Sequence, residues 1–227
     1  MGNASGMDGM IPHGVIFDCD GVLVDSEVIA FDLLGNDLSI YAPDITRAQM
    51  ERDLLGLTLA GVADKARRLG ANLPDDWVEN FYDRLYSRLE QGAPLVPGVL
   101  TVLDALDAAN IPYAVGSNGS LRKMQITLGQ HQGLTQRFHG RIFSGQDMPR
   151  PKPFPDVFLH AARAMNVSPA HCIVVEDSPT GARAARAASM HCMGYAPHGS
   201  DALSAEGAQL FTKMTDLPLL LNLITQT

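Results

Sequence analysis

The architecture follows from the segment Val15-Ile16-Phe17-Asp18-Cys19-Asp20-Gly21-Val22-Leu23-Val24-Asp25-Ser26. Apolar residues run directly into two carboxylates, and a glycine and a second apolar run come next. A continuous apolar run that ends abruptly in charge is typical of the carboxyl end of a buried parallel strand. Ligands bind at that edge of open α/β sheets. The segment therefore predicts a strand that carries Asp18 and Asp20 into a site.

Two other interpretations apply to this segment. Asp and Gly are common turn residues, and an Asp-x-Asp pair also begins the calcium loop of an EF-hand. That loop needs glycine at its sixth position and glutamate at its twelfth. Counted from Asp18, Gly21 is fourth and Ile29 is twelfth, which excludes the calcium loop. The plain turn stays open until the downstream motifs are considered.

Between Ser26 and Pro94 the pattern is helical, and no segment reads convincingly as a strand. Apolar residues recur at three- and four-residue spacing in segments 26–34, 44–55, 58–69 and 74–89. Pro43-Asp44 and Pro74-Asp75 indicate helix starts, while Gly56 and Gly70 indicate stops. We expect an all-helical cap domain over residues 28–94.

From Val99 onward, strand and helix patterns alternate. Strands are expected at 112–116, 141–143, 172–175, 192–195 and 210–211, and helices at 99–109, 120–129, 154–165, 179–188 and 217–224. Such alternation implies a parallel sheet with right-handed crossovers. We therefore predict an α/β fold, a doubly wound core over residues 11–27 and 95–227 that is interrupted by the helical insertion.

Composition narrows the classes of partner. The net charge of −8 and pI near 5.2 disfavour nucleic acid or an anionic membrane surface as partner, and no apolar run is long enough for a membrane helix. The cysteines, Cys19, Cys172 and Cys192, are scattered and suggest a reducing compartment. Residues 1–10 are polar and glycine-rich, without the features of a signal peptide, so we expect a flexible N-terminal segment and a cytoplasmic protein. No feature points to a particular oligomeric state.

Polar groups follow four of the predicted strands. They are Asp18 and Asp20; Ser117, Asn118 and Gly119; Lys152; and Glu176 and Asp177. Taken singly, each group has an ordinary explanation as a turn, a helix cap or a solvated loop. Because the carboxyl ends of parallel strands share one edge of a sheet, we expect all four groups to form one site.

Carboxylates gathered at one point repel one another, and a single lysine cannot balance them. A hard divalent cation with oxygen ligands can do so, and Mg²⁺ is the obvious candidate. We expect direct ligation by the Asp18 and Asp177 carboxylates and the Asp20 backbone carbonyl. Glu176 would ligate directly or through water.

This arrangement suits phosphoryl transfer. Asp18 is placed to attack phosphorus and form an aspartyl-phosphate, and Asp20 to protonate the leaving oxygen and later activate water. Ser117 and Asn118, with Gly119, would hold phosphate oxygens. Lys152 would neutralise developing charge and hold Asp18 in place.

These residues resemble the motifs of the haloacid dehalogenase superfamily. The matching segments are Asp18-x-Asp20-Gly-Val-Leu-Val-Asp25-Ser26, Ser117-Asn118-Gly119, Lys152-Pro153 and Glu176-Asp177-Ser178. The resemblance implies a Rossmann-like core, a helical cap inserted after the first motif, magnesium dependence and the aspartyl-phosphate mechanism. The dehalogenase branch lacks the second aspartate, so Asp20 disfavours dehalogenation.

Within the superfamily the chain resembles the phosphatase and β-phosphoglucomutase group. Mutases of that group have a histidine where this chain has Ala30 and an arginine where it has Leu59, and both departures favour hydrolysis. Segments around Lys123 and His160 are similar to bacterial 6-phosphogluconate phosphatases. We therefore predict a phosphatase for a small phosphorylated metabolite, a sugar or sugar-acid phosphate. The alternatives are a phosphohexomutase and a non-catalytic protein that binds a phosphorylated metabolite.

In the cap, the residues expected to contact substrate are those just after Asp25 and the loop Leu55-Gly56-Leu57-Thr58-Leu59. Cap arginines could meet an anionic substrate or simply form a solvated helix face. They are Arg52, Arg67, Arg68, Arg84 and Arg88.

Overall fold

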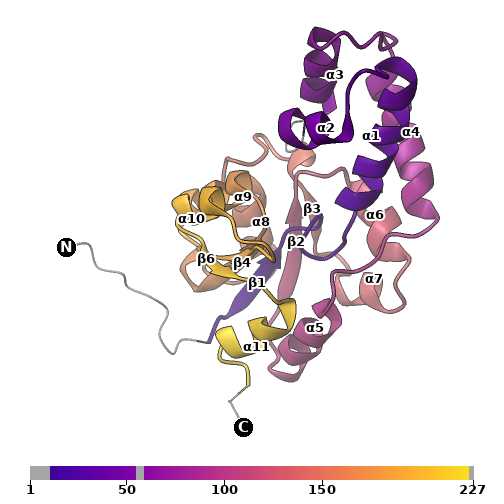
Figure 1. The fold of residues 1–227 in the computed structure, drawn as a ribbon. Helices are drawn as coiled ribbons and strands as arrows, with labels where there is room; N and C mark the ends of the chain where they lie inside the picture. Colours follow the sequence, from indigo (N-terminus) through magenta and orange to yellow (C-terminus); the bar gives the residue numbers. More distant parts are fainter. Residues whose placement is uncertain (1–10, 55–58, 225–227) are drawn as a thin grey trace. The chain divides into compact units, whose positions relative to one another are not determined.

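The computed structural model describes residues 11–54 and 59–224 (Figure 1). The chain divides into two compact units, one from Met1–Asp25 with Pro94–Thr227 and one from Ser26–Ala93. The sequence had led us to expect the divisions between 27 and 28 and between 94 and 95. The N-terminal segment 1–10 and positions 55–58 of the expected substrate loop lie outside the described residues.

The first unit is built on a parallel sheet of six strands, in the order β3-β2-β1-β4-β5-β6. The strands are β1 (Gly14–Phe17), β2 (Tyr113–Ser117), β3 (Ile142–Ser144), β4 (Cys172–Glu176), β5 (His191–Tyr195) and β6 (Gln209–Phe211). This confirms the predicted α/β class. Because β1 is flanked by β2 and β4, Phe17 pairs with Val115 on one side and Val175 on the other. The carboxyl ends of these three strands are therefore level.

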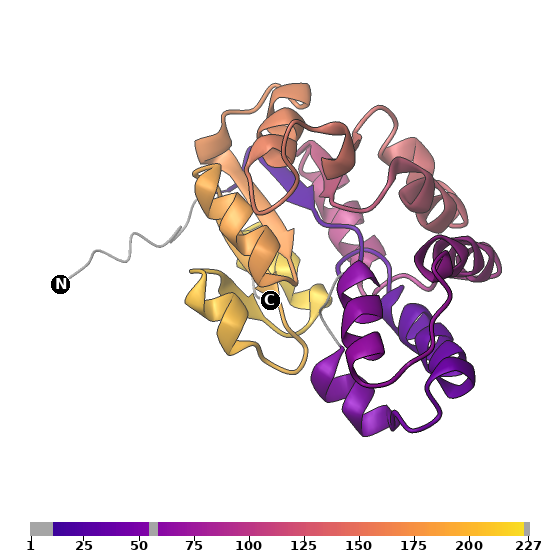
Figure 2. The same ribbon diagram turned by 90° about the horizontal axis from the view of Figure 1, so that it is seen from above.

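Helices cover both faces of this sheet. They are α5 (Val99–Ala108), α6 (Leu121–Gly129), α7 (Leu134–Arg137), α8 (Asp156–Ala164), α9 (Pro179–Ala187), α10 (Asp201–Ala205) and α11 (Leu217–Leu220). In Figures 1 and 2, α9 and α10 lie on the opposite side of the strands from α6 and α7.

Alternation along the strands explains the two layers. Ile16 and Val174 belong to a buried cluster with Phe158 of α8 and the alanines of α9. The neighbouring residue Phe17 has its ring edge-on to Tyr113, which in turn meets Phe138 just after α7. Successive residues of a strand point to opposite faces, so both sides of the sheet are buried.

The described part of the second unit has helices and no strand, as the sequence predicted. Its helices are α1 (Glu27–Tyr41), α2 (Arg47–Asp53), α3 (Leu59–Arg68) and α4 (Trp77–Glu90). Buried residues recur every four positions along α4, at Trp77, Phe81, Leu85 and Leu89. The helix packs this stripe against α1 and α3. Among the described residues, no helix is long and apolar enough to cross a membrane.

Some boundaries differ from the expected ones. The predicted start at Pro43-Asp44 is wrong, because α2 begins after Thr46, where Thr46 and Gln49 form a capping box. The short helices α7 and α10 were not expected, and α11 ends at Leu220 instead of 224. A helix of one turn leaves too little periodicity to be recognised in a sequence.

Candidate active site

The strand ends bring the predicted polar groups to one edge of the sheet. Asp18 directly follows β1, and its N–H donates to the Val175 carbonyl of β4 at 2.9 Å. Ser117 is the last residue of β2, and Glu176 the last residue of β4. Lys152 comes from the segment between β3 and α8. Residues far apart in the sequence therefore meet around the end of β1.

Lys152 links two carboxylates at the centre of this edge. Its Nζ lies 2.6 Å from Asp18 Oδ1 and 2.6 Å from Glu176 Oε1, and all three side chains are buried. Burial alone would lower the pKa of Lys152, but the two carboxylates raise it above its ordinary value. The lysine is thus a permanent cation shared by Asp18 and Glu176.

Glu176 is held on its other oxygen as well. Its Oε2 accepts hydrogen bonds from the Asp177 N–H at 3.1 Å, the Ser178 N–H at 3.0 Å and the Ser178 hydroxyl at 2.9 Å. A Cβ on Gly181, in the first turn of α9, would overlap the Glu176 carboxylate. Because both of its oxygens accept hydrogen bonds inside the protein, Glu176 anchors Lys152 firmly.

Asp177 lies beside the end of β1. A Cβ on Gly21 would overlap the Asp177 carboxylate, and Gly21 has a positive φ of 75°. Glycine is therefore required at position 21 both by the backbone and by the space that Asp177 occupies. This close approach brings Asp177 next to the Asp18-Cys19-Asp20 segment.

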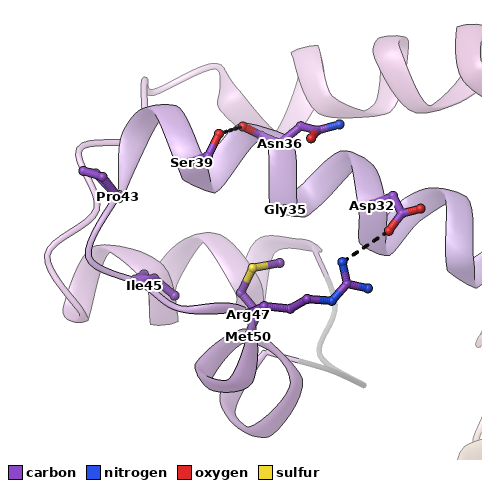
Figure 3. A pocket seen from close by; sticks show the side chains of 8 residues that line it. All are labelled: Asp32, Gly35, Asn36, Ser39, Pro43, Ile45, Arg47 and Met50. Atoms are coloured by element: carbon purple, nitrogen blue, oxygen red, sulfur yellow. Dashed lines mark hydrogen bonds and ion pairs between the residues drawn. The ribbon is translucent and has the colours of Figure 1, made fainter.

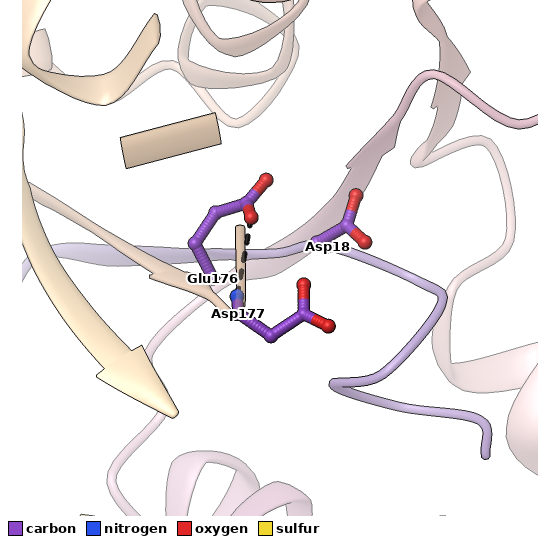
Figure 4. A group of neighbouring side chains, drawn as sticks. All are labelled: Asp18, Glu176 and Asp177. Atoms are coloured by element: carbon purple, nitrogen blue, oxygen red, sulfur yellow. Dashed lines mark hydrogen bonds between the residues drawn. The ribbon is translucent and has the colours of Figure 1, made fainter. Parts of the chain in front are cut away.

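The carboxylates of Asp18, Glu176 and Asp177 form a group that could hold a metal ion. One oxygen from each lies within 4.8 Å of the others, and Figure 4 shows the three side chains as neighbours. Two of these carboxylates, on Asp18 and Glu176, share one lysine. Clustered carboxylate oxygens are the ligands that a hard divalent cation such as Mg²⁺ prefers.

Burial and the neighbouring charges change the pKa of Asp18. Burial raises the pKa of Asp18 to about 7; Lys152 opposes the rise, while Glu176 and Asp20 add to it. Water stabilises a carboxylate better than a protein interior does. A cation close to Asp18 would favour its ionised form, which is the form that can act as a nucleophile.

Asp20 has a cationic partner that the sequence did not lead us to predict. The Nζ of Lys123 lies 2.8 Å from Asp20 Oδ1, and neither side chain is more than a quarter exposed. Lys123 is in the first turn of α6, and Ser120 caps that turn by accepting from the Lys123 N–H at 3.1 Å. Helical side chains lean toward the N-terminus, so a residue in a first turn covers the preceding loop. That geometry could have indicated Lys123 from the sequence.

The Asn118 side chain is engaged differently from the predicted phosphate contact. Its Oδ1 accepts from the Lys152 N–H at 2.9 Å, and its Nδ2 donates to the Lys152 carbonyl at 3.2 Å. Gly145 makes this arrangement possible, because a Cβ there would overlap Asn118 Oδ1. The amide therefore ties Lys152 to the end of β2, while the second hydrogen of Nδ2 is not used in this pair.

Ser117 and Gly119 lie next to Asp20. Ser117 Oγ accepts from the Gly119 N–H at 3.1 Å, so its hydroxyl proton can still be donated to a ligand. The Ser144 hydroxyl donates to the Gly119 carbonyl at 2.7 Å and holds this turn in place.

Cys19 is buried between the two aspartates of the first motif. Burial, and to a smaller extent the charges of Asp20 and Asp18, raise the pKa of its thiol. A protonated, buried thiol is a packing residue, as the sequence indicated.

The helical unit contains a separate surface pocket of about 520 Å³ (Figure 3). Its lining includes Asp32, Asn36, Ser39 and Arg47. The Asp32–Arg47 ion pair, at 3.6 Å, is more than half exposed on both sides. Exposed pairs of this kind contribute little energy, so the pocket lacks the buried charges found at the sheet edge.

Known proteins resemble this chain over most of its length. The model of the hydrolase family described as haloacid dehalogenase-like matches residues 12–189. A 6-phosphogluconate phosphatase of Escherichia coli K12 is 32% identical over 91% of this chain and 93% of its own length. Hexitol phosphatase B of the same strain is 31% identical over 77% of this chain and 79% of its own.

A solved structure agrees with these relatives. It is a HAD family hydrolase from Deinococcus radiodurans R1 with bound phosphate and sodium, 30% identical to this chain. The alignment covers 95% of this chain and 98% of that one, with a TM-score of 0.80. The similarity therefore extends across both units of the chain.

Proposed function

This chain belongs to the haloacid dehalogenase-like hydrolases, and from that membership we propose that it is a magnesium-dependent phosphatase. One observation carries the proposal. Lys152 holds Asp18 at the end of β1, with Asp177 beside it and Asp20 two residues further on. This supports the proposal, because a carboxylate suited to act as nucleophile lies beside a cation and two residues from a carboxylate suited to act as an acid–base group.

In the proposed reaction Asp18 attacks phosphorus and forms an aspartyl-phosphate, while Asp20 gives a proton to the leaving oxygen. Asp20 then takes a proton from water, which attacks the aspartyl-phosphate and releases inorganic phosphate. The Ser117 hydroxyl and the Asn118 backbone N–H donate to phosphate oxygens, and Lys152 neutralises charge on the phosphoryl group.

The metal would be held by the carboxylates of Asp18 and Asp177 and the backbone carbonyl of Asp20, with Glu176 beside them. A bound Mg²⁺ supplies positive charge that screens the nucleophile from the phosphate and polarises the phosphoryl group. The cluster of three carboxylates supports this assignment, since one oxygen from each lies within 4.8 Å of the others.

The proposed substrate is a small sugar or sugar-acid phosphate. Two relatives at more than 30% identity carry the names 6-phosphogluconate phosphatase and hexitol phosphatase. Both names describe phosphate esters of six-carbon polyhydroxy compounds, so 6-phosphogluconate and hexitol phosphates are the first compounds to assay.

Hydrolysis of p-nitrophenyl phosphate with Mg²⁺ or with EDTA tests the reaction class. We expect turnover that depends on magnesium and is lost in the Asp18→Asn variant. Turnover that is undiminished in EDTA, or in Asp18→Asn, would disprove the proposed mechanism. A panel of sugar, sugar-acid and polyol phosphates, scored by phosphate release, would then rank the substrates.

The same panel separates the two alternatives. A phosphohexomutase would convert a phosphosugar to its isomer faster than it released phosphate, whereas we expect release to dominate because Ala30 and Leu59 replace the two residues that mutases use. Binding of panel compounds in the absence of any turnover would instead indicate a non-catalytic binding protein.

A further inference from the structure

We propose that Lys123 is the positioning residue for Asp20, and that it acts on the steps in which Asp20 moves protons. The inference rests on the proposed phosphatase function and adds a residue that its mechanism did not include. Its basis is the ion pair between Lys123 Nζ and Asp20 Oδ1 at 2.8 Å.

Two different lysines pair with the carboxylates at the edge of the sheet. Lys152 contacts Asp18 and Glu176, each at 2.6 Å, while Lys123 contacts Asp20. The nucleophile and the acid–base group are thus each held by a separate cation, on separate elements. A change at Lys123 should therefore affect Asp20 without displacing Asp18.

The Lys123 stem lies where the predicted phosphate contacts lie. A Cβ placed on Gly119 would be 3.4 Å from Asp20 Oδ2, 3.5 Å from Ser117 Oγ and 3.9 Å from Lys123 Cδ. These three side chains therefore lie around the position that a Gly119 Cβ would occupy. Lys123 therefore reaches Asp20 from the side on which the substrate phosphate is expected.

The backbone around Lys123 is firmly held. Ser120 caps the start of α6, and the buried Thr127 hydroxyl donates to the Lys123 carbonyl at 3.1 Å. The side chain itself is 19% exposed, so its freedom to move away from Asp20 is limited. A partly buried lysine side chain on a capped helix can fix the orientation of one carboxylate.

The test uses Lys123→Met, which keeps most of the side-chain volume and removes the charge. The exposed Gln125→Met on the same helix is the control. Protonation by Asp20 matters little for p-nitrophenolate, a good leaving group, and greatly for the alkoxide of a sugar phosphate. We expect Lys123→Met to lower the rate of aspartyl-phosphate formation, measured by rapid quench, about 10-fold more for a sugar phosphate than for p-nitrophenyl phosphate. Lys123→Arg should recover part of the loss.

A double-mutant cycle with Asp20→Asn, on the sugar phosphate, provides the decisive comparison. Lys123→Met should have little further effect once the Asp20 carboxylate is absent. An equal loss in both backgrounds, or a rise in KM without a fall in kcat, would overturn the proposal and make Lys123 a substrate ligand. Equal losses for both leaving groups, with a fall in Tm, would reduce Lys123 to a structural residue.

One readout does not depend on turnover. The ¹³Cγ resonance of Asp20 in the intact protein should shift in Lys123→Met and stay in place in Gln125→Met. An unchanged resonance would overturn the ion pair itself. An inactive wild-type protein with the expected shift would disprove the phosphatase function while leaving the ion pair established, so the two failures are distinguishable.

Discussion

The α/β unit and the helical unit each bury a carboxylate to the same extent, with 7% exposure for Asp18 and 7% for Asp37. Asp37 accepts from the Trp77 indole N–H at 3.0 Å and pairs with Arg84, so it has a cation of its own. Asp18 shares its cation with Glu176 and lies close to Asp177. Asp37 therefore has a cation to itself and fits a structural role, whereas Asp18 must share its cation with a second carboxylate and fits a site that binds a further cation.

The strongest test of this comparison is the effect on turnover. We predict that Asp18→Asn lowers kcat by at least about 10³-fold, because the nucleophile is lost. Asp37→Asn, the matched substitution in the other unit, should leave kcat of the folded protein within a few-fold. Steady-state hydrolysis of p-nitrophenyl phosphate measures both, and a comparable loss in the two variants would contradict the assignment.

A smaller loss of kcat is expected when the Lys152 main chain loses its two hydrogen bonds to the Asn118 side chain. Asn118→Ala removes both hydrogen bonds to the Lys152 main chain and should lower kcat by roughly 10- to 100-fold with little change in KM. Gly145→Ala would push on Asn118 Oδ1 and should produce a similar loss although it does not remove the amide. A raised KM with unchanged kcat would instead favour the sequence-based prediction that the Asn118 side chain holds phosphate.

In the helical unit the expected effect is on stability. Asp37→Ala leaves the buried Trp77 N–H without its acceptor and should lower the free energy of unfolding by roughly 1–3 kcal/mol. Because Arg84 is 42% exposed on its side chain, water can solvate it and limit the cost. Urea denaturation measures the change, and a stability equal to that of the wild type would show that Asp37 is dispensable.

The smallest predicted effect is a gain in stability, whereas the preceding variant loses stability. The folded pKa of Asp18, about 7, lies above its ordinary value of 3.8, so the metal-free fold loses stability as the pH rises from about 4 to 7. In EDTA at pH 8, Asp18→Asn should therefore unfold with a higher free energy than the wild type. The difference should shrink toward pH 5.

Magnesium should reverse this order, because it stabilises the wild type and has no comparable site in the variant. At a Mg²⁺ concentration 100 times the Kd, linkage predicts a gain of about 2.7 kcal/mol for the wild type. Thermal unfolding with and without Mg²⁺ tests both expectations. An equal rise in Tm with Mg²⁺ in the two proteins would show that Asp18 is not a ligand of the metal.

Much of the fold was predictable because the strands carry strong local signals. The apolar runs before Asp18 and Glu176 identified β1 and β4, and the parallel topology then required their carboxyl ends to meet. The start of α2 was missed because Thr46 and Gln49 compete with the nearby Pro43-Asp44 as helix-start signals. Which of two adjacent signals prevails depends on packing that a sequence does not display.

The site was less predictable, because residue types do not reveal partners. The four polar groups do meet at one edge, yet their division into a Lys152 cluster and a Lys123–Asp20 pair depends on side-chain reach. The hydrogen bond between Asn118 and the main chain of Lys152, 34 residues away, could not be predicted from the sequence either. Gly181 was the clearest signal that the sequence analysis did not use, since a glycine within a helix weakens that helix and indicates that something nearby needs the space.

That glycine makes positions 176 and 181 dependent on each other. The first turn of α9 lies against the Glu176 carboxylate so closely that no side chain fits at 181. A shorter aspartate at 176 would withdraw the carboxylate and open room for alanine at 181, at the cost of its contact with Lys152. An engineering library for this protein should therefore vary the two positions together, because a single substitution at 181 would force the acidic side chain away from its lysine.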